Sequence, residues 1–440
     1  MAGRPAADEA DETAARSYGR GAAVLSVGIG VTGLVTFAYF ALASHTLPEN
    51  EYGRITVLWS AVFITVSVLY RPVEQLLSRT IADRDARGVH GGEHLRVAAT
   101  IQLALGALFA VVALVLRNPI QDDLLGGSST LYWILIATVL AYAASYFARG
   151  FLAGHHRFGL YGGLVLMEAS SRFLFALAVA VGIAEGQDVV ALGMTAAPIV
   201  SLAVVPWALG PRLRGAPEPE PEPVGPEEAV EPQFTLAHGS GFAVAVLLIM
   251  LSEQTFLNAG PLLVEASDGA RGAALAGFTF NVLLIARAPL QLFQAVQTSI
   301  LPHLTRLRAI GESDPFRRSV NLTLLAIAGF AACVALVMLA FGPALMDLVF
   351  GGDFDYERAG LVLVSVGMGL YLSAATLNQA LLAHGRAPHA AAAWALCAAG
   401  FALFLVLVDF DDRVLQVELA FVGAAACLSL LLGLLYRRGR

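Results

Sequence analysis

The sequence contains no lysine, so all 27 of its basic residues are arginine. This absence excludes the Walker A lysine of P-loop ATPases, Schiff-base chemistry and a Ser-x-x-Lys nucleophile. Cysteine is scarce, and Cys333, Cys397 and Cys427 lie in apolar segments without C-x-x-C spacing, which argues against a zinc site or a disulfide framework. The histidines show no H-x-x-H or H-E-x-x-H spacing. We therefore expect a protein that is not an enzyme and that needs no metal or cofactor.

Charged residues are also few. They make up 14% of the 440 residues, whereas 57% are hydrophobic and the mean hydropathy is +0.71. A water-soluble surface does not tolerate this composition, so we predict an all-α integral membrane protein. Because a spanning helix needs about 20 apolar residues, about twelve spans fill the chain and leave no room for a soluble catalytic domain.

Apolar runs place the predicted spans in two sets of six. The first set is 22–44, 55–77, 97–116, 131–150, 160–183 and 189–209, and the second is 238–264, 273–300, 320–346, 358–383, 389–408 and 414–436. A Pro- and Glu-rich segment separates them and is predicted to be a solvated linker, either a plain tether or a regulatory docking segment. The predicted domains are an N-terminal tail (1–21), a six-helix bundle (22–209), the linker (210–236), a second six-helix bundle (237–436) and a C-terminal tail (437–440).

Arginine is unevenly divided between the two predicted sides of the membrane. If the N-terminus is cytoplasmic, the outer segments contain only Arg54, Arg117, Arg271, Arg358 and Arg413. Segments rich in arginine face the cytoplasm in membrane proteins. We therefore expect a multi-pass protein of the plasma membrane with both termini in the cytoplasm.

The two sets of spans share short motifs in the same order. Arg71-Pro72-Val73-Glu74-Gln75 in the second span matches Arg287-Ala288-Pro289-Leu290-Gln291 in the eighth, since each has Arg, Pro and a Gln four residues after the Arg. Six spans per repeat keep both halves in the same orientation. The repeats therefore predict two bundles related by a pseudo-twofold axis along the membrane normal.

Charged side chains inside a bilayer normally face a protein interior or a water-filled cavity. Arg287, Gln291 and Gln294 fall on one helical face, and Arg71 with Gln75 repeats this pattern. We therefore predict that the two arginines face each other across a central cleft, where guanidinium groups suit phosphate oxygens. The alternatives are that each arginine is neutralised locally, or that it reaches the membrane interface.

Four acidic or basic residues in other positions complete the candidates. Glu168 and Arg172 stand at i and i+4, a spacing that predicts a structural salt bridge. Glu253 has no basic residue one turn away, so it is protonated, finds a partner on another helix, or titrates during transport. Glu253 and Glu74 are the candidates for coupling to H⁺ or Na⁺.

Several of these stretches resemble a known group of transporters. Leu47-Pro48-Glu49-Asn50-Glu51-Tyr52-Gly53, the two Arg-Pro motifs and Leu382-Ala383-His384-Gly385 resemble the polysaccharide-transporter branch of the multidrug, oligosaccharidyl-lipid and polysaccharide exporter superfamily. The resemblance implies a V-shaped cleft that moves a polyprenyl-diphosphate-linked oligosaccharide across the plasma membrane by alternating access. In that reading the diphosphate is bound by Arg71 and Arg287, and the glycan by Gln75, Gln291 and Gln294.

Three alternatives stay open. Lipid II flippases of this superfamily usually carry an Arg-rich first span, whereas residues 22–44 contain no charge. A cation-coupled antiporter of drugs or other small molecules would use Glu253 or Glu74 as its proton site. A scaffold that recruits partners through the linker would need no charged interior. The expected partners are the lipid-linked oligosaccharide, membrane lipids and polysaccharide-assembly proteins, and no nucleic acid.

Overall fold

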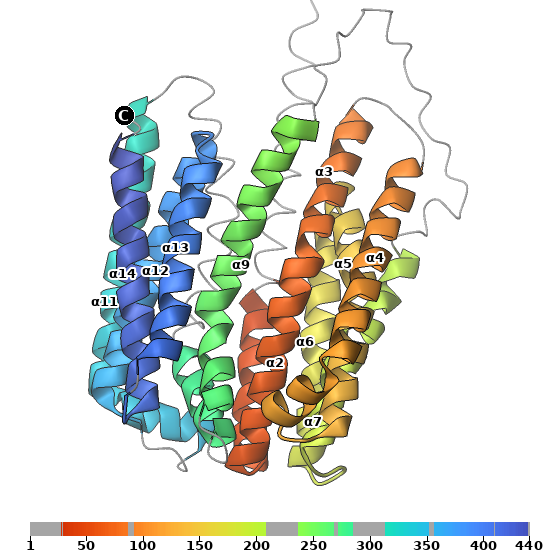
Figure 1. Ribbon diagram of the computed structural model, residues 1–440, viewed down its shortest axis with the longest axis vertical. Coiled ribbons are helices and arrows are strands. Elements are labelled where there is room, and N and C mark those ends of the chain that lie inside the picture. Colours follow the sequence, from red (N-terminus) through yellow and green to blue (C-terminus); the bar gives the residue numbers. More distant parts are fainter. Residues whose placement is uncertain are drawn as a thin grey trace, which may run out of the picture.

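The computed structural model describes residues 28, 30–86, 92–207, 236–267, 272–284, 313–351, 356–408 and 410–438. All secondary structure in these ranges is helical (Figure 1). After a helix over residues 30–46, the first half contains α2 (Glu49–Leu69), α3 (Arg71–Ala86), α4 (Glu93–Val115), η1 (Pro119–Leu124), α5 (Ser129–Gly154), α6 (Phe158–Ala180), α7 (Gln187–Ser201) and η2 (Leu202–Val204). The second half contains α9 (Leu236–Ser267), a helix Gly272–Leu284, α11 (Ser313–Phe350), α12 (Arg358–Ala383), α13 (Ala387–Leu407) and α14 (Arg413–Arg438). The predicted all-α fold is confirmed.

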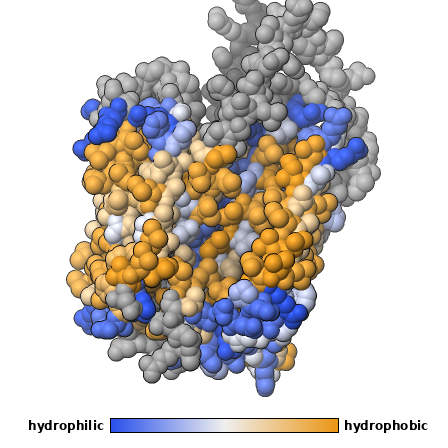
Figure 2. Space-filling view, in the orientation of Figure 1, coloured by the Kyte–Doolittle hydropathy of each residue, from blue (hydrophilic) through white to orange (hydrophobic). Residues whose placement is uncertain are grey.

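Within the described ranges, ten helices are long and apolar enough to cross a membrane. They correspond to all the predicted spans except the first and the eighth, which are described only over residues 30–46 and 272–284. Figure 2 shows the expected surface, with an apolar band between two hydrophilic ends and further hydrophilic residues between the two apolar halves. The N-terminal tail and residues 210–235 of the predicted linker lie outside the described residues.

The helices form two groups that lie side by side (Figure 1). In the first group α3 packs on α5, and α7 packs on both α5 and α6. In the second group α12 packs on α11 and α14, and α13 packs on α9 and α14. The groups meet where α2 packs on α9, and where the Phe40 and Phe280 rings approach to 4.6 Å between centroids.

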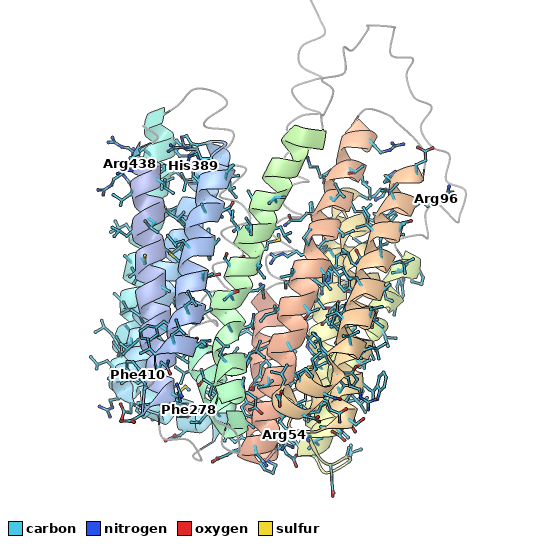
Figure 3. The ribbon with its side chains drawn as sticks, viewed as in Figure 1. Arg54, Arg96, Phe278, His389, Phe410 and Arg438 are labelled. Carbon is cyan, nitrogen blue, oxygen red and sulfur yellow. The ribbon has the colours of Figure 1, made fainter. Side chains whose placement is uncertain are left out.

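The two ends of the bundle differ in charge. Arg96 and Arg438 lie at one end, which we call the basic end, and Arg54 lies at the other (Figure 3). That other end contains the N-termini of α2 and α12, with Glu49 and Glu357, and we call it the acidic end. The distribution of arginine makes the basic end the one we expect in the cytoplasm.

The two halves approach each other closely near the acidic end. A Cβ atom added at Gly53 of α2 would overlap the carbonyl oxygen of Ala273. Beside this contact the Tyr52 hydroxyl donates to the side-chain oxygen of Asn281, whose Nδ2 donates to the Tyr356 hydroxyl at 3.1 Å. Burial raises the pKa of Tyr356, so this hydroxyl stays neutral beside acidic residues. We call Tyr52, Gly53, Ala273, Asn281 and Tyr356 the seal.

Replacing Gly53 with alanine is expected to destabilise the protein, because the added methyl group has no space against Ala273. In an open helix position the same change would stabilise the helix by about 1 kcal/mol. The matched control is Gly163→Ala in α6, where an added Cβ meets nothing within 4 Å. Thermal unfolding of the detergent-solubilised proteins should show a lower Tm for Gly53→Ala and an equal or higher Tm for Gly163→Ala. Equal Tm values for the two variants would contradict the close contact.

Candidate functional site

A cavity of about 320 Å³ lies between the two halves, and four charged side chains line it. Arg71, Glu74 and Arg149 come from the first half, and Glu253 comes from the second. The remaining lining residues are Thr32, Gly33, Thr36, Phe37, Phe40, Trp59, Phe63, Ser67, Tyr146, Tyr161, Val165, Gln254, Leu257, Asn258 and Leu284. The wall therefore combines both signs of charge with aromatic rings, hydroxyls and side-chain amides. Charged groups from two helix bundles that share one cavity are typical of a substrate site.

A break between two helices places Arg71 at this depth. Helix α2 ends at Leu69, Tyr70 forms a turn, and α3 begins at Arg71 with Pro72 as its second residue. Proline is tolerated in the first turn of a helix because its missing N–H needs no partner there. Arg71 is exposed to the cavity, and the ionisable neighbour that acts on it most strongly is Glu253 of the other half.

Glu74 lies one turn further along α3 and is held by the first half. Its carboxylate accepts a hydrogen bond of 2.7 Å from the Tyr161 hydroxyl of α6, and Arg149 is the cation that acts on it most strongly. Gly150 permits this arrangement, since an added Cβ would lie 2.9 Å from the Glu74 carbonyl oxygen. The glycine lets α5 approach α3 closely, which brings Arg149 to the cavity beside Glu74.

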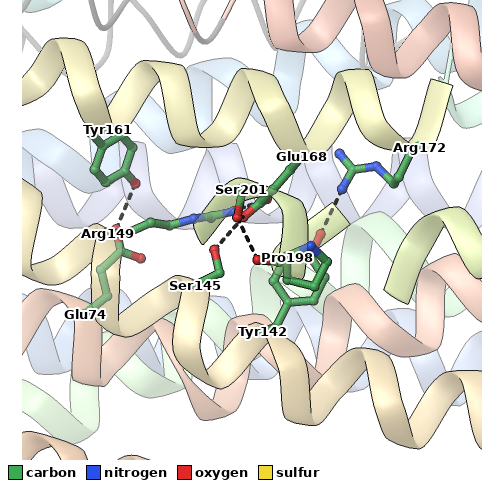
Figure 4. A network of polar contacts seen from close by, with 9 residues as sticks. All are labelled: Glu74, Tyr142, Ser145, Arg149, Tyr161, Glu168, Arg172, Pro198 and Ser201. Carbon is green, nitrogen blue, oxygen red and sulfur yellow. Dashed lines mark hydrogen bonds and ion pairs between the residues drawn. The ribbon is translucent and has the colours of Figure 1, made fainter. Parts of the chain in front are cut away.

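The predicted salt bridge between Glu168 and Arg172 is wrong. Glu168 forms its ion pair with Arg149 of α5, and it also accepts hydrogen bonds from Ser145 and from Ser201 (Figure 4). The Glu168 side chain is 2% exposed and the Arg149 side chain 12%. The i,i+4 rule describes isolated helices, whereas here α5 offers a guanidinium and a hydroxyl, and α7 a second hydroxyl, to one buried carboxylate.

Arg172 has partners other than Glu168. It donates a hydrogen bond of 2.8 Å to the Tyr142 hydroxyl, and its guanidinium carbon lies 5.0 Å from the centroid of the Trp59 ring. Cation–π contact with an aromatic face stabilises a guanidinium, by more where water is excluded. The aromatic side chains of α2 and α5 thus take the place of the predicted carboxylate.

The predicted site residues fall into three groups. Arg71, Glu74 and Glu253 line one cavity. Gln75 is exposed on α3 and is not among the residues that line the cavity. The other predicted substrate contacts, Arg287, Gln291 and Gln294, lie outside the described residues.

Arg149 and Tyr161 belong to the site and were not predicted from the sequence. The predicted fourth span ends at residue 150, which makes Arg149 one more basic residue near the cytoplasmic side. In the structure α5 continues to Gly154, so Arg149 lies more than a turn inside the helix. The sequence feature that could have indicated this position is the pair Gly150 and Gly154. Small residues spaced four apart mark close helix contacts in membranes, so this pair is a sign that the helix continues past residue 150.

The described residues contain no group of three or more His, Cys, Asp or Glu that could hold a metal ion. The polar side chains of α9 are paired with one another: Asn258 Nδ2 donates to the Gln254 side-chain oxygen at 3.0 Å. Glu253 lies next to this pair on the wall formed by the second half.

The chain is similar in structure to known transporters over nearly its whole length. The Vibrio cholerae MATE transporter VcmN in its bent form is 17% identical, with a TM-score of 0.58, and the match covers 96% of this chain and 98% of that one. An inward-facing multidrug resistance MATE family transporter of the MOP superfamily is 14% identical, with a TM-score of 0.66 and coverage of 94% and 97%. A MOP superfamily transporter from Pyrococcus furiosus, described as having a binding pocket of reversed polarity, is 14% identical, with a TM-score of 0.60 and coverage of 96% and 95%.

No protein-family model matches the sequence, and no curated protein does. At identities this low the structural likeness shows the fold alone. The chain has the two-lobed, V-shaped helical fold of the MATE transporters, in agreement with the superfamily that the sequence resembles. The likeness does not separate the polysaccharide-transporter branch from the multidrug branch.

Proposed function

We propose that the protein is a membrane transporter that carries its substrate through the central cavity by alternating access. The observation that carries this proposal is that Arg71 of one half and Glu253 of the other line one cavity and interact with each other. A substrate that binds between two lobes can be released on the other side when the lobes rock about it. The proposed location is the plasma membrane, with the basic end in the cytoplasm.

The proposed substrate is a polyprenyl-diphosphate-linked oligosaccharide, moved to the outer leaflet for export of a cell-surface polysaccharide. The Arg71 guanidinium stays ionised in any surroundings and suits phosphate oxygens. Trp59 and Phe63 of the first half stack at 4.0 Å between ring centroids on the cavity wall, and Gln254 and Asn258 of the second half line the same cavity. Aromatic faces beside side-chain amides suit a sugar, which has both apolar C–H faces and hydroxyls. Arg287, Gln291 and Gln294 remain proposed contacts from the second half.

The electrostatic attraction between Arg71 and Glu253 also supports a coupling mechanism. An anionic diphosphate that binds Arg71 must compete with the Glu253 carboxylate, because both seek the same guanidinium. Protonation of Glu253, or a Na⁺ ion bound to it, would release Arg71 for the substrate. Glu253 is therefore the proposed coupling residue. Glu74 is the less suitable candidate, since Tyr161 and Arg149 already satisfy it.

A second candidate function is a cation-coupled antiporter of small molecules. The observation that favours it is the balance of charge, since Glu74 and Glu253 match Arg71 and Arg149 on the cavity wall. A cationic drug could use the two carboxylates. The two proposals share the cavity and differ in the sign of the charge on the substrate.

Reconstitution into liposomes distinguishes the two proposals. We expect the protein to move a polyprenyl-diphosphate oligosaccharide with a fluorescent label on its sugar, so that external dithionite bleaches the whole population of the label. Empty liposomes, in which only the outer leaflet is bleached, are the control. Ethidium efflux driven by a proton gradient, without movement of the labelled lipid, would favour the antiporter instead. Faster movement of lipid II than of other glycans would favour the peptidoglycan alternative.

A further inference from the structure

A second polar cavity, of about 150 Å³, lies at the acidic end of the second half. It is enclosed by the helix Gly272–Leu284 and by the first turns of α12 and α14. Three carboxylates and two aromatic rings line it, from Tyr356, Glu357, Asp412, Glu418 and Phe278. Phe278 lies near Phe410 at this end of the molecule, far from Arg438 (Figure 3). None of these five residues lines the central cavity.

Glu418 is the unusual member of this set. Its side chain is 7% exposed, and no hydrogen bond or ion pair to it is present within the described ranges. A Cβ added at Gly360 would overlap both of its carboxylate oxygens, so the glycine is what gives the carboxylate its space. A buried carboxylate without a partner is costly. Its position on the cavity wall leaves this carboxylate open to a ligand.

The charge around Glu418 is negative. The charged groups that act on it are those of Asp412 and Glu357, both exposed at the acidic end. Asp412 caps α14, accepting from the backbone N–H groups of Val414 at 2.9 Å and of Leu415 at 3.1 Å. Helix N-termini stabilise the ionised form of acidic side chains such as these. Of the described basic residues, those nearest in sequence, Arg358 and Arg413, are not on the cavity wall. A cation bound from solution would balance the charge of these carboxylates.

The volume and the lining residues of the cavity indicate which class of cation it could bind. In the described part of the chain no three acidic side chains come together closely enough to hold a metal ion, so a larger ligand suits this wall better than a metal ion does. The cavity volume is several times the volume of about 30 Å³ that one water molecule occupies in liquid water. Phe278 and Tyr356 stack at 4.7 Å between ring centroids and form an aromatic wall. Ammonium groups bind both carboxylates and aromatic faces.

We propose that this cavity binds a primary alkylammonium ion, with the Glu418 carboxylate as its main partner and the rings of Phe278 and Tyr356 against its carbon chain. The ligand reaches the cavity from the acidic end, between Glu357 and Asp412. The site is separate from the central cavity and does not depend on the transported substrate.

Equilibrium binding of radiolabelled 1,4-diaminobutane to the full-length protein in detergent tests the proposal. We expect saturable binding that Glu418→Gln weakens at least tenfold, because the variant loses the central negative charge and keeps the shape. Gly360→Ala should weaken binding as well, since it displaces the carboxylate. Glu357→Gln is the second variant, because this exposed position tolerates the change without risk to folding, and we expect severalfold weaker binding.

The controls separate this site from surface charge and from the central cavity. Glu185→Gln removes an exposed carboxylate that is not on the cavity wall and should leave binding unchanged. Glu253→Gln should also leave it unchanged, and a loss of binding there would instead place the amine in the central cavity and overturn the proposal. Unchanged binding in both Glu418→Gln and Glu357→Gln would overturn it too. So would equal displacement of the probe by Na⁺ or Ca²⁺, which would indicate a metal site.

Discussion

Replacing Arg71 with alanine is expected to abolish translocation of the labelled polyprenyl-diphosphate sugar in liposomes. A hydrogen bond to a charged group contributes about 1.5–3 kcal/mol, and a guanidinium can make two to a diphosphate. The loss of about 3 kcal/mol corresponds to a roughly 100-fold lower affinity. Arg71→Lys keeps the charge and loses the planar fork, so it should retain intermediate activity.

The matched control for this prediction is Arg96→Ala, which removes an exposed arginine at the basic end. It should translocate the labelled lipid at the normal rate. The two proposed functions give opposite results for Arg71→Ala: a flippase fails, whereas an antiporter of cations gains from a freed Glu253 carboxylate. Normal translocation by a well-folded Arg71→Ala protein would remove Arg71 from the substrate site.

The second large effect concerns stability. Glu168→Ala leaves the Arg149 guanidinium without its ion-pair partner on a wall where only 12% of that side chain is exposed. Removing one member of a buried pair costs about 3–5 kcal/mol. We therefore expect Glu168→Ala to lower the Tm of the purified protein strongly and to reduce its yield.

A paired replacement separates the cost of an unpaired charge from the value of the pair. In Arg149→Met with Glu168→Leu both charges are gone and the volume is kept, so the stability should return to that of the original protein or exceed it. Glu185→Ala, at an exposed position, is the control for the loss of a carboxylate. If the paired variant is as unstable as Glu168→Ala, the ion pair itself contributes to stability. Its transport activity should still fall, because Arg149 also lines the central cavity.

Hydropathy was sufficient to predict the helices, because each span must bury its own backbone polar groups and must be long and apolar to do so. Pro72 is the sequence feature that accompanies the break at Tyr70. The same reasoning placed Arg71 and Glu253 inside the membrane, where charges need a cavity. What it could not supply was the partner of each charge. That depends on which helices become neighbours.

Glu168 shows why the partners of the charged residues could not be predicted from the sequence. Its predicted partner was the residue four positions along its own helix, and its observed partner, Arg149, lies on another helix. Gly150 lets α3 and α5 approach closely, and the Arg172 guanidinium lies over the Trp59 ring, and both are contacts between helices. The hydrogen bond between Tyr52 and Asn281 could not be predicted either, since the two residues come from different halves of the chain. Sequence periodicity describes one helix at a time and does not contain these contacts.

The seal has a consequence for how easily the lobes can part. A contact between the lobes built from aliphatic side chains alone would lose its whole hydrophobic stabilisation when water entered. The hydroxyl and amide groups of Tyr52, Asn281 and Tyr356 would instead exchange their mutual hydrogen bonds for hydrogen bonds to water, at a small net cost. The seal is therefore stable while water is excluded, and it opens at a small cost in free energy once water enters. A protein that must open and close at every turnover needs this kind of reversibility.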